Sequence, residues 1–457
     1  MSSNMRGVFI GILIIAVIVV IALVGFGLGG GKKTATTTVS TVSTATSQAL
    51  ARQAQERAGS GGAGVSGGPG SESSDAVVGT GAPGAAGIDA TTAQQLDLNR
   101  PFAPSSPWNT AASGEPTDSN SDRMLRLATQ RIGVQEIGNQ APKTVRITDH
   151  HGVYIKSGVQ SIPIYTTTNG VQTRLVCRQL PPYCGDGRNV PSLPIPNDAV
   201  PVPAFDGPLV IENPESGVAY AMWRARKGSG NVMSYQFMRK WTLNGPGYQV
   251  PNSVSTIGSG LPSFAGILMP QEVRQGRIEH ALAIAVPGPA ATKYVQPASA
   301  TDGVGSVNSL PEGARIRLKA GVKAPKLRGR TNLVAQKAIM KALRTYGAIV
   351  VERSISPALY AKANANWNAP LRATNGRYLA ADGRPLPQLR NKRVNATPLL
   401  RGNEIQGLHL SDFEVVQLPS PIFTFPALSS TEAAMRASSR NIATNSSSAA
   451  RWASSSR

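Results

Sequence analysis

The chain has 457 residues, with 47 glycines and 34 prolines, and only 5% of its residues are aromatic. This composition indicates a loop-rich β protein joined to flexible segments. The formal net charge of +21 predicts attraction to polyanions such as acidic polysaccharide, an anionic lipid surface or nucleic acid. The sequence contains no nucleic-acid reader motif, so nucleic acid is the least favoured of these partners. The alternative is a solvated basic surface with no specific partner.

An uninterrupted apolar run, from Val8 to Leu28, contains no charged residue. A helix needs about 20 apolar residues to cross a bilayer, so residues 1–31 are predicted to form a single transmembrane anchor. The run is longer than the core of a signal peptide, and Gly-Gly-Gly-Lys-Lys follows it instead of a cleavage site. Positive charges flank both ends and leave the orientation open. The two cysteines and the downstream composition favour a cell-membrane protein whose folded domain is extracellular.

Three further segments follow the predicted anchor. Residues 32–98 are rich in Thr, Ser and Gly and predict a disordered linker, because they offer little apolar surface to bury. Residues 99–420 predict a single extracellular β-sandwich domain. The Ser-, Ala- and Arg-rich residues 421–457 predict a disordered tail.

Within the folded region, short alternating segments are separated by turn signals every 8 to 12 residues, which is typical of a mainly β sandwich or jelly roll. Asn169-Gly170 predicts a hairpin between its flanking strands. Residues 209–223 predict a second hairpin, and residues 234–243 predict one further strand. The proline-rich residues 191–207 predict an edge segment, because proline lacks the N–H that a central strand needs.

One or two helices are predicted within the folded region. The spacing of apolar residues predicts a short helix over residues 121–129 and a longer one over residues 331–346, which Gly347 is placed to end. A buried strand is predicted over residues 348–352. Residues 277–286 alternate, so a strand there would place His280 on its apolar face.

The two cysteines, Cys177 and Cys184, are separated by six residues that include Pro181-Pro182. This spacing predicts a disulfide that closes a small loop in an oxidising compartment. A metal-binding pair is the alternative, although no histidine or further cysteine lies nearby in the sequence.

The order of several segments resembles a group of exported actinobacterial β-sandwich proteins. The matching segments are LVIEN, GRIEHALAI, YVQPASATDG, LPEGARIRL and ALRTYGAIVVE, and the similarity covers about residues 108–352. The resemblance implies the fold and the exported location but no reaction. The chain departs from the group's pattern at Arg317 and Lys319, where a neutral residue and Asp are common, and at Glu352, where Asp is common.

Four residues are candidate catalytic groups: His280, Asp302, Glu312 and Tyr346. A histidine can move protons near neutral pH, and Asp302 with Glu312 could supply the paired carboxyl groups of a glycoside hydrolase. Tyr346 could act as the base of a polysaccharide lyase. The structural alternatives are a hydrogen-bonded core histidine for His280 and turn-capping roles for the two carboxylates.

Four further residues are candidate substrate-binding groups: Arg315, Arg317, Lys319 and Trp223. Three cations on one strand face could neutralise a uronate carboxylate, although a solvated basic strand face is the alternative. No metal or cofactor site is predicted. Asp149, His150 and His151 could in principle bind a metal. Adjacent strand residues point to opposite faces, however, so the two histidines would not converge on one ion.

The sequence therefore predicts a surface-anchored domain that is directed at cell-envelope polysaccharide and binds or cleaves an anionic glycan. Whether it is an enzyme stays open, with polysaccharide lyase and glycoside hydrolase as the two reaction classes. The alternative is a non-catalytic structural or adhesion protein that holds envelope polyanions by its basic surface. DNA capture at the cell surface follows from the charge alone.

Overall fold

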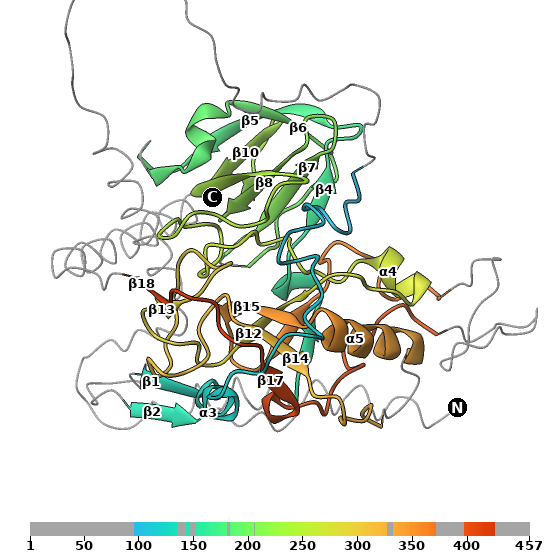
Figure 1. Ribbon diagram of the computed structural model, residues 1–457. Coiled ribbons are helices and arrows are strands. Elements are labelled where there is room, and N and C mark those ends of the chain that lie inside the picture. Colours follow the sequence, from blue (N-terminus) through green and yellow to red (C-terminus); the bar gives the residue numbers. More distant parts are fainter. Residues whose placement is uncertain are drawn as a thin grey trace, which may run out of the picture. The chain divides into compact units, whose positions relative to one another are not determined.

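The computed structural model describes residues 96–134, 143–146, 152–180, 183–204, 206–326, 332–371 and 397–425 (Figure 1). The predicted anchor, most of the linker, most of the tail and the Asp149–His151 triplet lie outside these residues. Among the described helices, none has the length and apolar character needed to cross a membrane. The mainly β fold predicted from the sequence is confirmed, with several sheets and few helices.

The largest sheet has six strands in the order β17-β14-β15-β12-β16-β3. Its strands, in chain order, are β3 (Tyr154–Lys156), β12 (Leu282–Val286), β14 (Arg315–Leu318), β15 (Ala348–Arg353), β16 (Ala358–Tyr360) and β17 (Phe413–Val415). The sheet is mixed, because β12 runs parallel to β15 and β16 runs parallel to β3, while the other pairs are antiparallel.

Two four-stranded sheets share a core. One has the order β11-β8-β7-β4 and the other the order β6-β5-β10-β9. Their strands are β4 (Ile164–Thr166), β5 (Val171–Cys177), β6 (Ser192–Ile195), β7 (Leu209–Asn213), β8 (Val218–Trp223), β9 (Arg226–Lys227), β10 (Val232–Tyr235) and β11 (Phe237–Thr242). Leu209 and Ile211 of β7 and Leu175 of β5 belong to the same buried cluster, so the two sheets pack against each other.

The alternation of residues along the central strands explains why both faces of the six-stranded sheet are buried. In β12, Leu282, Ile284 and Val286 enter one core cluster, and Ala283 between them enters another. The first cluster also contains Ile339 and Leu343 of the long helix, so this helix covers that face of the sheet. The second cluster contains Val210 of β7 and therefore joins the six-stranded sheet to a four-stranded one.

The described helices are α3 (Ser121–Leu127), α4 (Pro270–Gln275) and α5 (Leu333–Thr345), with short 3-10 turns η1 (Gly158–Gln160), η3 (Asp186–Asn189) and η4 (Leu410–Asp412). Helix α5 lies beside β14 and β15 (Figure 1). Its predicted end is confirmed: Gly347 has a φ of 73° and donates its N–H to the carbonyl of Ala342. Two small sheets complete the described fold: β1 (Gln130–Val134) with β2 (Lys143–Arg146), and β13 (Lys293–Tyr294) with β18 (Phe423–Thr424).

The predicted hairpin at Asn169-Gly170 is wrong. The chain does turn there, with Asn169 at a φ of 59°, but β4 before the turn pairs with β7 and β5 after it pairs with β6 and β10. The hairpin over residues 209–223 is confirmed as β7 and β8. The single strand predicted over residues 234–243 is instead two strands, β10 and β11, in different sheets.

The predicted strand over residues 277–286 is shorter than expected. Only Leu282–Val286 forms strand β12, and His280 lies in a bend before it. Strand β6, which lies within the proline-rich residues 191–207, is at the edge of its sheet, as predicted. The predicted disulfide between Cys177 and Cys184 is confirmed, and its sulfur atoms are 2.08 Å apart.

Candidate functional site

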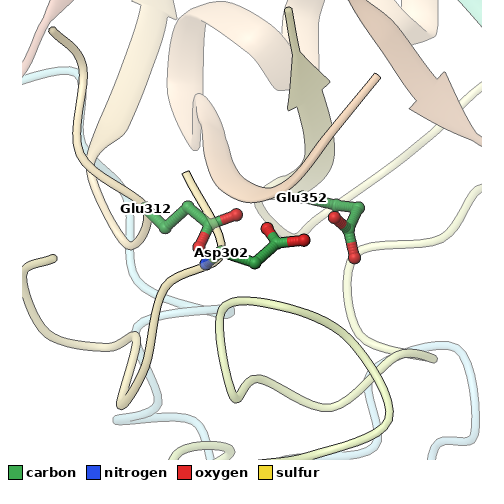
Figure 2. A group of neighbouring side chains, drawn as sticks. All are labelled: Asp302, Glu312 and Glu352. Atoms are coloured by element: carbon green, nitrogen blue, oxygen red, sulfur yellow. Dashed lines mark hydrogen bonds between the residues drawn. The ribbon is translucent and has the colours of Figure 1, made fainter. Parts of the chain in front are cut away.

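Three carboxyl groups converge near the end of β15: those of Asp302, Glu312 and Glu352 (Figure 2). One oxygen atom from each lies within 4.8 Å of the others. Two of the side chains are almost completely shielded from solvent, with Asp302 3% and Glu312 0% exposed. Glu352 is half-buried and lines a neighbouring pocket.

Glycine at position 313 allows Glu312 to reach the cluster. Gly313 has a φ of 85°, and a Cβ atom there would lie 1.8 Å from the carbonyl oxygen of Val295. The same glycine donates its N–H to the carbonyl of Val350, which fixes this corner to β15. The glycine that follows Glu312 in the LPEGARIRL segment is therefore needed for the close approach of the chain to the central strand.

Glu352 points toward the pocket because β15 contains an extra residue. Val350 pairs with Ile284 and Glu352 pairs with Ala285, so Val351 is unpaired in the ladder. In a regular strand, residues 351 and 352 would face opposite sides of the sheet. Here both line the same pocket. A β-bulge of this kind redirects the side chain that follows it.

Hydrogen bonds and one ion pair hold the three carboxyl groups in place. Glu352 accepts the N–H groups of Gly258 and Arg353 at 3.0 and 2.9 Å, and Glu312 accepts the N–H of Asp302 at 3.2 Å. The Nε atom of Arg353 lies 3.0 Å from Oδ2 of Asp302. Gly258 packs so closely that a Cβ atom there would lie 2.3 Å from Oδ1 of Asp302.

The crowding of negative charge favours protons on the cluster. Burial raises the pKa of Glu312 well above its usual value, and the nearby Asp302 and Glu352 carboxylates raise it further. Burial raises the pKa of Glu352 to about 8, again with a contribution from Asp302. Three carboxylates this close, two of them shielded from water, cannot all carry charge without a compensating cation or protons.

A pocket of about 210 Å³ opens beside Glu352. Its wall combines the aromatic side chains of Trp223 and Tyr360 with the charged side chains of Lys156, Asp206, Glu352 and Arg353. The Nε1–H of Trp223 donates to Asp206 at 3.2 Å, and the Lys156 ammonium lies 5.1 Å from the centre of the Tyr360 ring. Burial raises the pKa of Tyr360 well above its usual value, and nearby carboxylates raise it further.

The structure brings together three of the residues singled out from the sequence and separates the others from them. Asp302 and Glu312 are neighbours, and Trp223 lines the pocket beside Glu352. Tyr346 ends helix α5, where its carbonyl accepts a hydrogen bond from Arg315, and it does not line the pocket. Glu352 was noted in the sequence only as a departure from a pattern, because the bulge that directs it has no sequence signature.

His280 is a buried, paired histidine. Its Nε2 atom lies 3.0 Å from a carboxylate oxygen of Glu272 in α4, and its Nδ1 atom lies 2.9 Å from the carbonyl oxygen of Ala281. Burial lowers the pKa of His280, but the charge and hydrogen bonds of these acceptors more than offset this effect, so its pKa is raised. Because both ring nitrogens face acceptors, the charged imidazolium fits this position and links α4 to the start of β12.

The three predicted substrate-binding cations, Arg315, Arg317 and Lys319, contact other parts of the fold. Arg315 donates to the carbonyls of Pro107, Thr110 and Tyr346. Arg317 lies 2.6 Å from Glu414 and also donates to the carbonyls of Ala112 and Glu115, and Lys319 lies 3.3 Å from Asp122. These side chains join β14 and the residue after it to the segment before α3, to α3 itself and to the neighbouring β17, and none of the three lines the pocket.

The chain was compared with family models, curated proteins and solved structures. None of them matches. The resemblance to exported actinobacterial proteins therefore stays a prediction. Three segments that carry it, TDG, LPEGARIRL and YGAIVVE, nevertheless supply one carboxyl group each to the cluster. The assignment of function rests on the chemistry of the pocket and of these carboxyl groups.

Proposed function

We propose that the pocket beside Glu352 binds one sugar unit of an acidic cell-envelope polysaccharide, on a domain that the predicted anchor at residues 8–28 holds at the outer face of the membrane. The observation that carries this proposal is the combination of Trp223 and Tyr360 with charged side chains around one cavity. Ligand pockets commonly pair aromatic walls with a few polar groups that fix orientation.

Each part of the pocket matches a part of a uronic acid. The aromatic side chains offer apolar surface to the faces of the sugar ring. Glu352 and Asp206 offer acceptors to its hydroxyl groups, and the ammonium of Lys156 offers a charge-assisted hydrogen bond to its carboxylate. Arg353 also lines the pocket, but it is already paired with Asp302.

The geometry favours binding over cleavage by a pair of carboxyl groups. A glycoside hydrolase needs two carboxyl groups that flank the bond to be broken. Asp302 and Glu312 do not line the pocket, and both are shielded from solvent. Asp206 does line it, but its carboxylate accepts the Nε1–H of Trp223. We therefore propose a binding function and treat cleavage as an outcome that the following experiment would reveal.

The experiment titrates the full chain with oligosaccharides of a uronic acid and with the matching neutral sugars by calorimetry. We expect tighter binding of the acidic series, and a roughly tenfold loss of that affinity in Lys156→Gln, as for one charge-assisted hydrogen bond. Lys240→Gln, a change of the same kind at an exposed position of β11, is the control and should bind as the unaltered chain does.

Equal affinity for acidic and neutral sugars, or no binding of either, would overturn the proposal. So would a Lys156→Gln variant with unchanged affinity. Analysis of the sugar after incubation checks for cleavage, because shortened or unsaturated products would show that the pocket also catalyses a reaction.

A second candidate function is the non-catalytic capture of envelope polyanions by the basic surface. This second proposal is based on a cluster of three arginines next to the pocket: Arg178, Arg224 and Arg226. Arg178 donates to the carbonyl of Arg224 at 2.5 Å, and the guanidinium of Arg224 lies 4.6 Å from the ring centre of Trp223. Burial lowers the pKa of Arg224 to about 10, and repulsion by the other two arginines contributes to this shift.

The fold is consistent with an exported domain of this kind. We propose that the two four-stranded sheets, which share one buried cluster, form the β-sandwich predicted from the sequence. The parallel pairs β4–β7 and β5–β10 distinguish this arrangement from an all-antiparallel jelly roll. The disulfide between Cys177 and Cys184 supports an oxidising location.

A further inference from the structure

We infer that Asp302, Glu312 and Glu352 form a binding site for one divalent cation with a preference for oxygen ligands, of which Ca²⁺ fits best. This inference does not depend on the saccharide proposal, because the cluster lies behind the pocket wall and only Glu352 belongs to both. Support for a cation comes in four parts: unpartnered oxygens, charge, size and access.

The first part is the shortage of hydrogen-bond donors around shielded oxygen atoms. Among the residues that the structure describes, none donates a hydrogen bond to Oδ1 of Asp302 or to Oε1 of Glu312. Both side chains are at least nine-tenths buried, and Figure 2 shows the Glu312 carboxyl group turned toward Asp302. Buried polar atoms almost always have partners, so unpartnered oxygens that converge indicate a ligand that accepts their lone pairs.

The second part is the charge of the cluster. When all three carboxyl groups are ionised they carry three negative charges, and Arg353 is the one described cation in contact with them. Lys156 acts on Glu352 only at a longer distance. A divalent cation would balance the charge that Arg353 leaves, and it could do so while Arg353 keeps its contact with Oδ2 of Asp302.

The third part is the size of the site. If the three oxygens lay at the corners of a triangle with sides of 4.8 Å, its centre would be about 2.8 Å from each. Ca²⁺ binds oxygen at about 2.3–2.6 Å and accepts irregular geometry, so a small inward movement completes the contacts. Mg²⁺ requires about 2.0–2.1 Å and near-octahedral geometry, so it would demand a larger rearrangement.

The fourth part is access to the site. Glu352 is half-buried and lines the pocket, so a cation can enter along its carboxyl group, and water in the pocket can complete the coordination. The absence of a side chain at Gly258 matters here, because a Cβ atom would lie 2.3 Å from Oδ1 of Asp302 and would crowd the oxygens. A cation at this place would also fix the end of β15 and the pocket wall that Glu352 forms.

The test titrates the full chain, stripped of metal with a chelator, with CaCl₂ alone and with MgCl₂ alone, by calorimetry and by thermal unfolding. We expect saturable binding of one Ca²⁺ per chain, weaker binding of Mg²⁺, and a higher unfolding temperature with Ca²⁺. Glu312→Gln keeps the shape and removes a charge, so Ca²⁺ affinity should fall at least tenfold. Glu404→Gln makes the same change at another fully buried glutamate, outside the cluster, and should leave Ca²⁺ affinity unchanged.

Several results would overturn the inference. One is the absence of both heat and thermal shift in the unaltered chain at Ca²⁺ up to about 10 mM, above the millimolar Kd of the weakest extracellular calcium modules. That result would mean that protons alone neutralise the cluster. Another is equal Ca²⁺ affinity in Glu312→Gln, which would place the cation elsewhere. Because no sugar is present, failure here would leave the saccharide proposal untouched, and Lys156→Gln would still test that proposal.

Discussion

The buried pair of His280 and Glu272 shows how the environment of one residue decides its role. Both side chains are almost inaccessible, at 2% and 5% exposed, and each has a further backbone partner. A histidine held between two acceptors is stabilised in its charged form and is a poor general base. Its contribution is to connect helix α4 to the segment that enters β12.

This pair makes the stability of the chain depend on pH. Because the pKa of His280 is raised on folding, its contribution is complete below the unfolded value of about 6.5 and is lost as pH rises through the folded pKa. His280→Gln should lower the free energy of unfolding by about 3–5 kcal/mol at pH 6, as expected when one member of a buried pair is removed. It should also remove this component of the pH dependence.

Chemical denaturation at a series of pH values measures both effects. Glu272→Gln is the matched variant, since it removes the other member of the pair with little change in shape. If His280→Gln retained the pH profile of the unaltered chain, the pair would not be the source of that dependence.

At the same scale, the sequence allowed two of the three clustered carboxylates to be identified. Asp302 and Glu312 stood out because they lie in turn motifs, and turns commonly carry polar side chains to a site. Glu352 did not stand out, because a regular alternation along β15 would place it, like Val350, on the face of the sheet that helix α5 covers. The arginines of β14 were chosen from the sequence as substrate-binding candidates, but their contacts within the fold could not be predicted from it. Arg315 and Arg317 satisfy backbone carbonyls more than 200 positions earlier in the sequence, and such long-range contacts have no local pattern.

Among the elements, α5 illustrates a local signal that tertiary contacts reinforce. Asn332 caps its first turn by accepting the N–H groups of Val334 and Ala335 at 2.9 and 3.1 Å. Its amide also donates to the carbonyl of Leu399 at 2.9 Å, and the side chain is fully buried. One side chain therefore both begins the helix and joins it to the segment that starts at residue 397.

Replacing this cap should separate the two contributions. Asn332→Ala removes the cap and the bond to Leu399, and we expect it to cost about 2–3 kcal/mol of unfolding free energy. Asn332→Ser keeps a capping oxygen but cannot reach Leu399, so it should recover about 1 kcal/mol of that loss. Urea denaturation measures both changes. A change within about 0.5 kcal/mol for the alanine variant would show that the cap carries no weight.

Strand pairing is the part of the fold that local patterns described least well. Asn169-Gly170 has the chemistry of a hairpin turn and does form a turn, yet the strands on its two sides belong to different sheets. The register of each strand is set by which neighbour buries its apolar face. In β7, alternate residues contribute to two separate cores, and nothing within β7 itself specifies those partners.

For the whole molecule, the net charge of +21 gives two kinds of binding with different dependence on salt. Contacts with a polyanion across a basic surface weaken as salt screens them. Binding of a single sugar in the pocket depends on stacking and on short hydrogen bonds, which salt affects less. The two proposed functions can therefore be separated without knowledge of the natural polymer.

We expect the affinity of the full chain for dextran sulfate to fall steeply between low and high NaCl concentration, while its affinity for a short uronic-acid oligosaccharide changes little. The double variant Arg178→Gln, Arg226→Gln should weaken dextran sulfate binding several-fold. Arg174→Gln with Arg188→Gln removes the same charge at two other exposed positions and serves as the control. Equal losses in both double variants would mean that net charge, and not the arginine cluster, controls polyanion binding.

The unpaired Val351 has a consequence for how this protein could change during evolution. If Val351 took the place opposite Ala285, the ladder would be regular, and Glu352 would move opposite Val286 on the face that helix α5 covers, although every side chain of the cluster would still be present. Deletion of Val351 would instead leave Glu352 directly after Val350, still opposite Ala285 and on the pocket side. The register of β15 against β12, and not the presence of three acidic residues alone, therefore decides whether a related chain keeps the site.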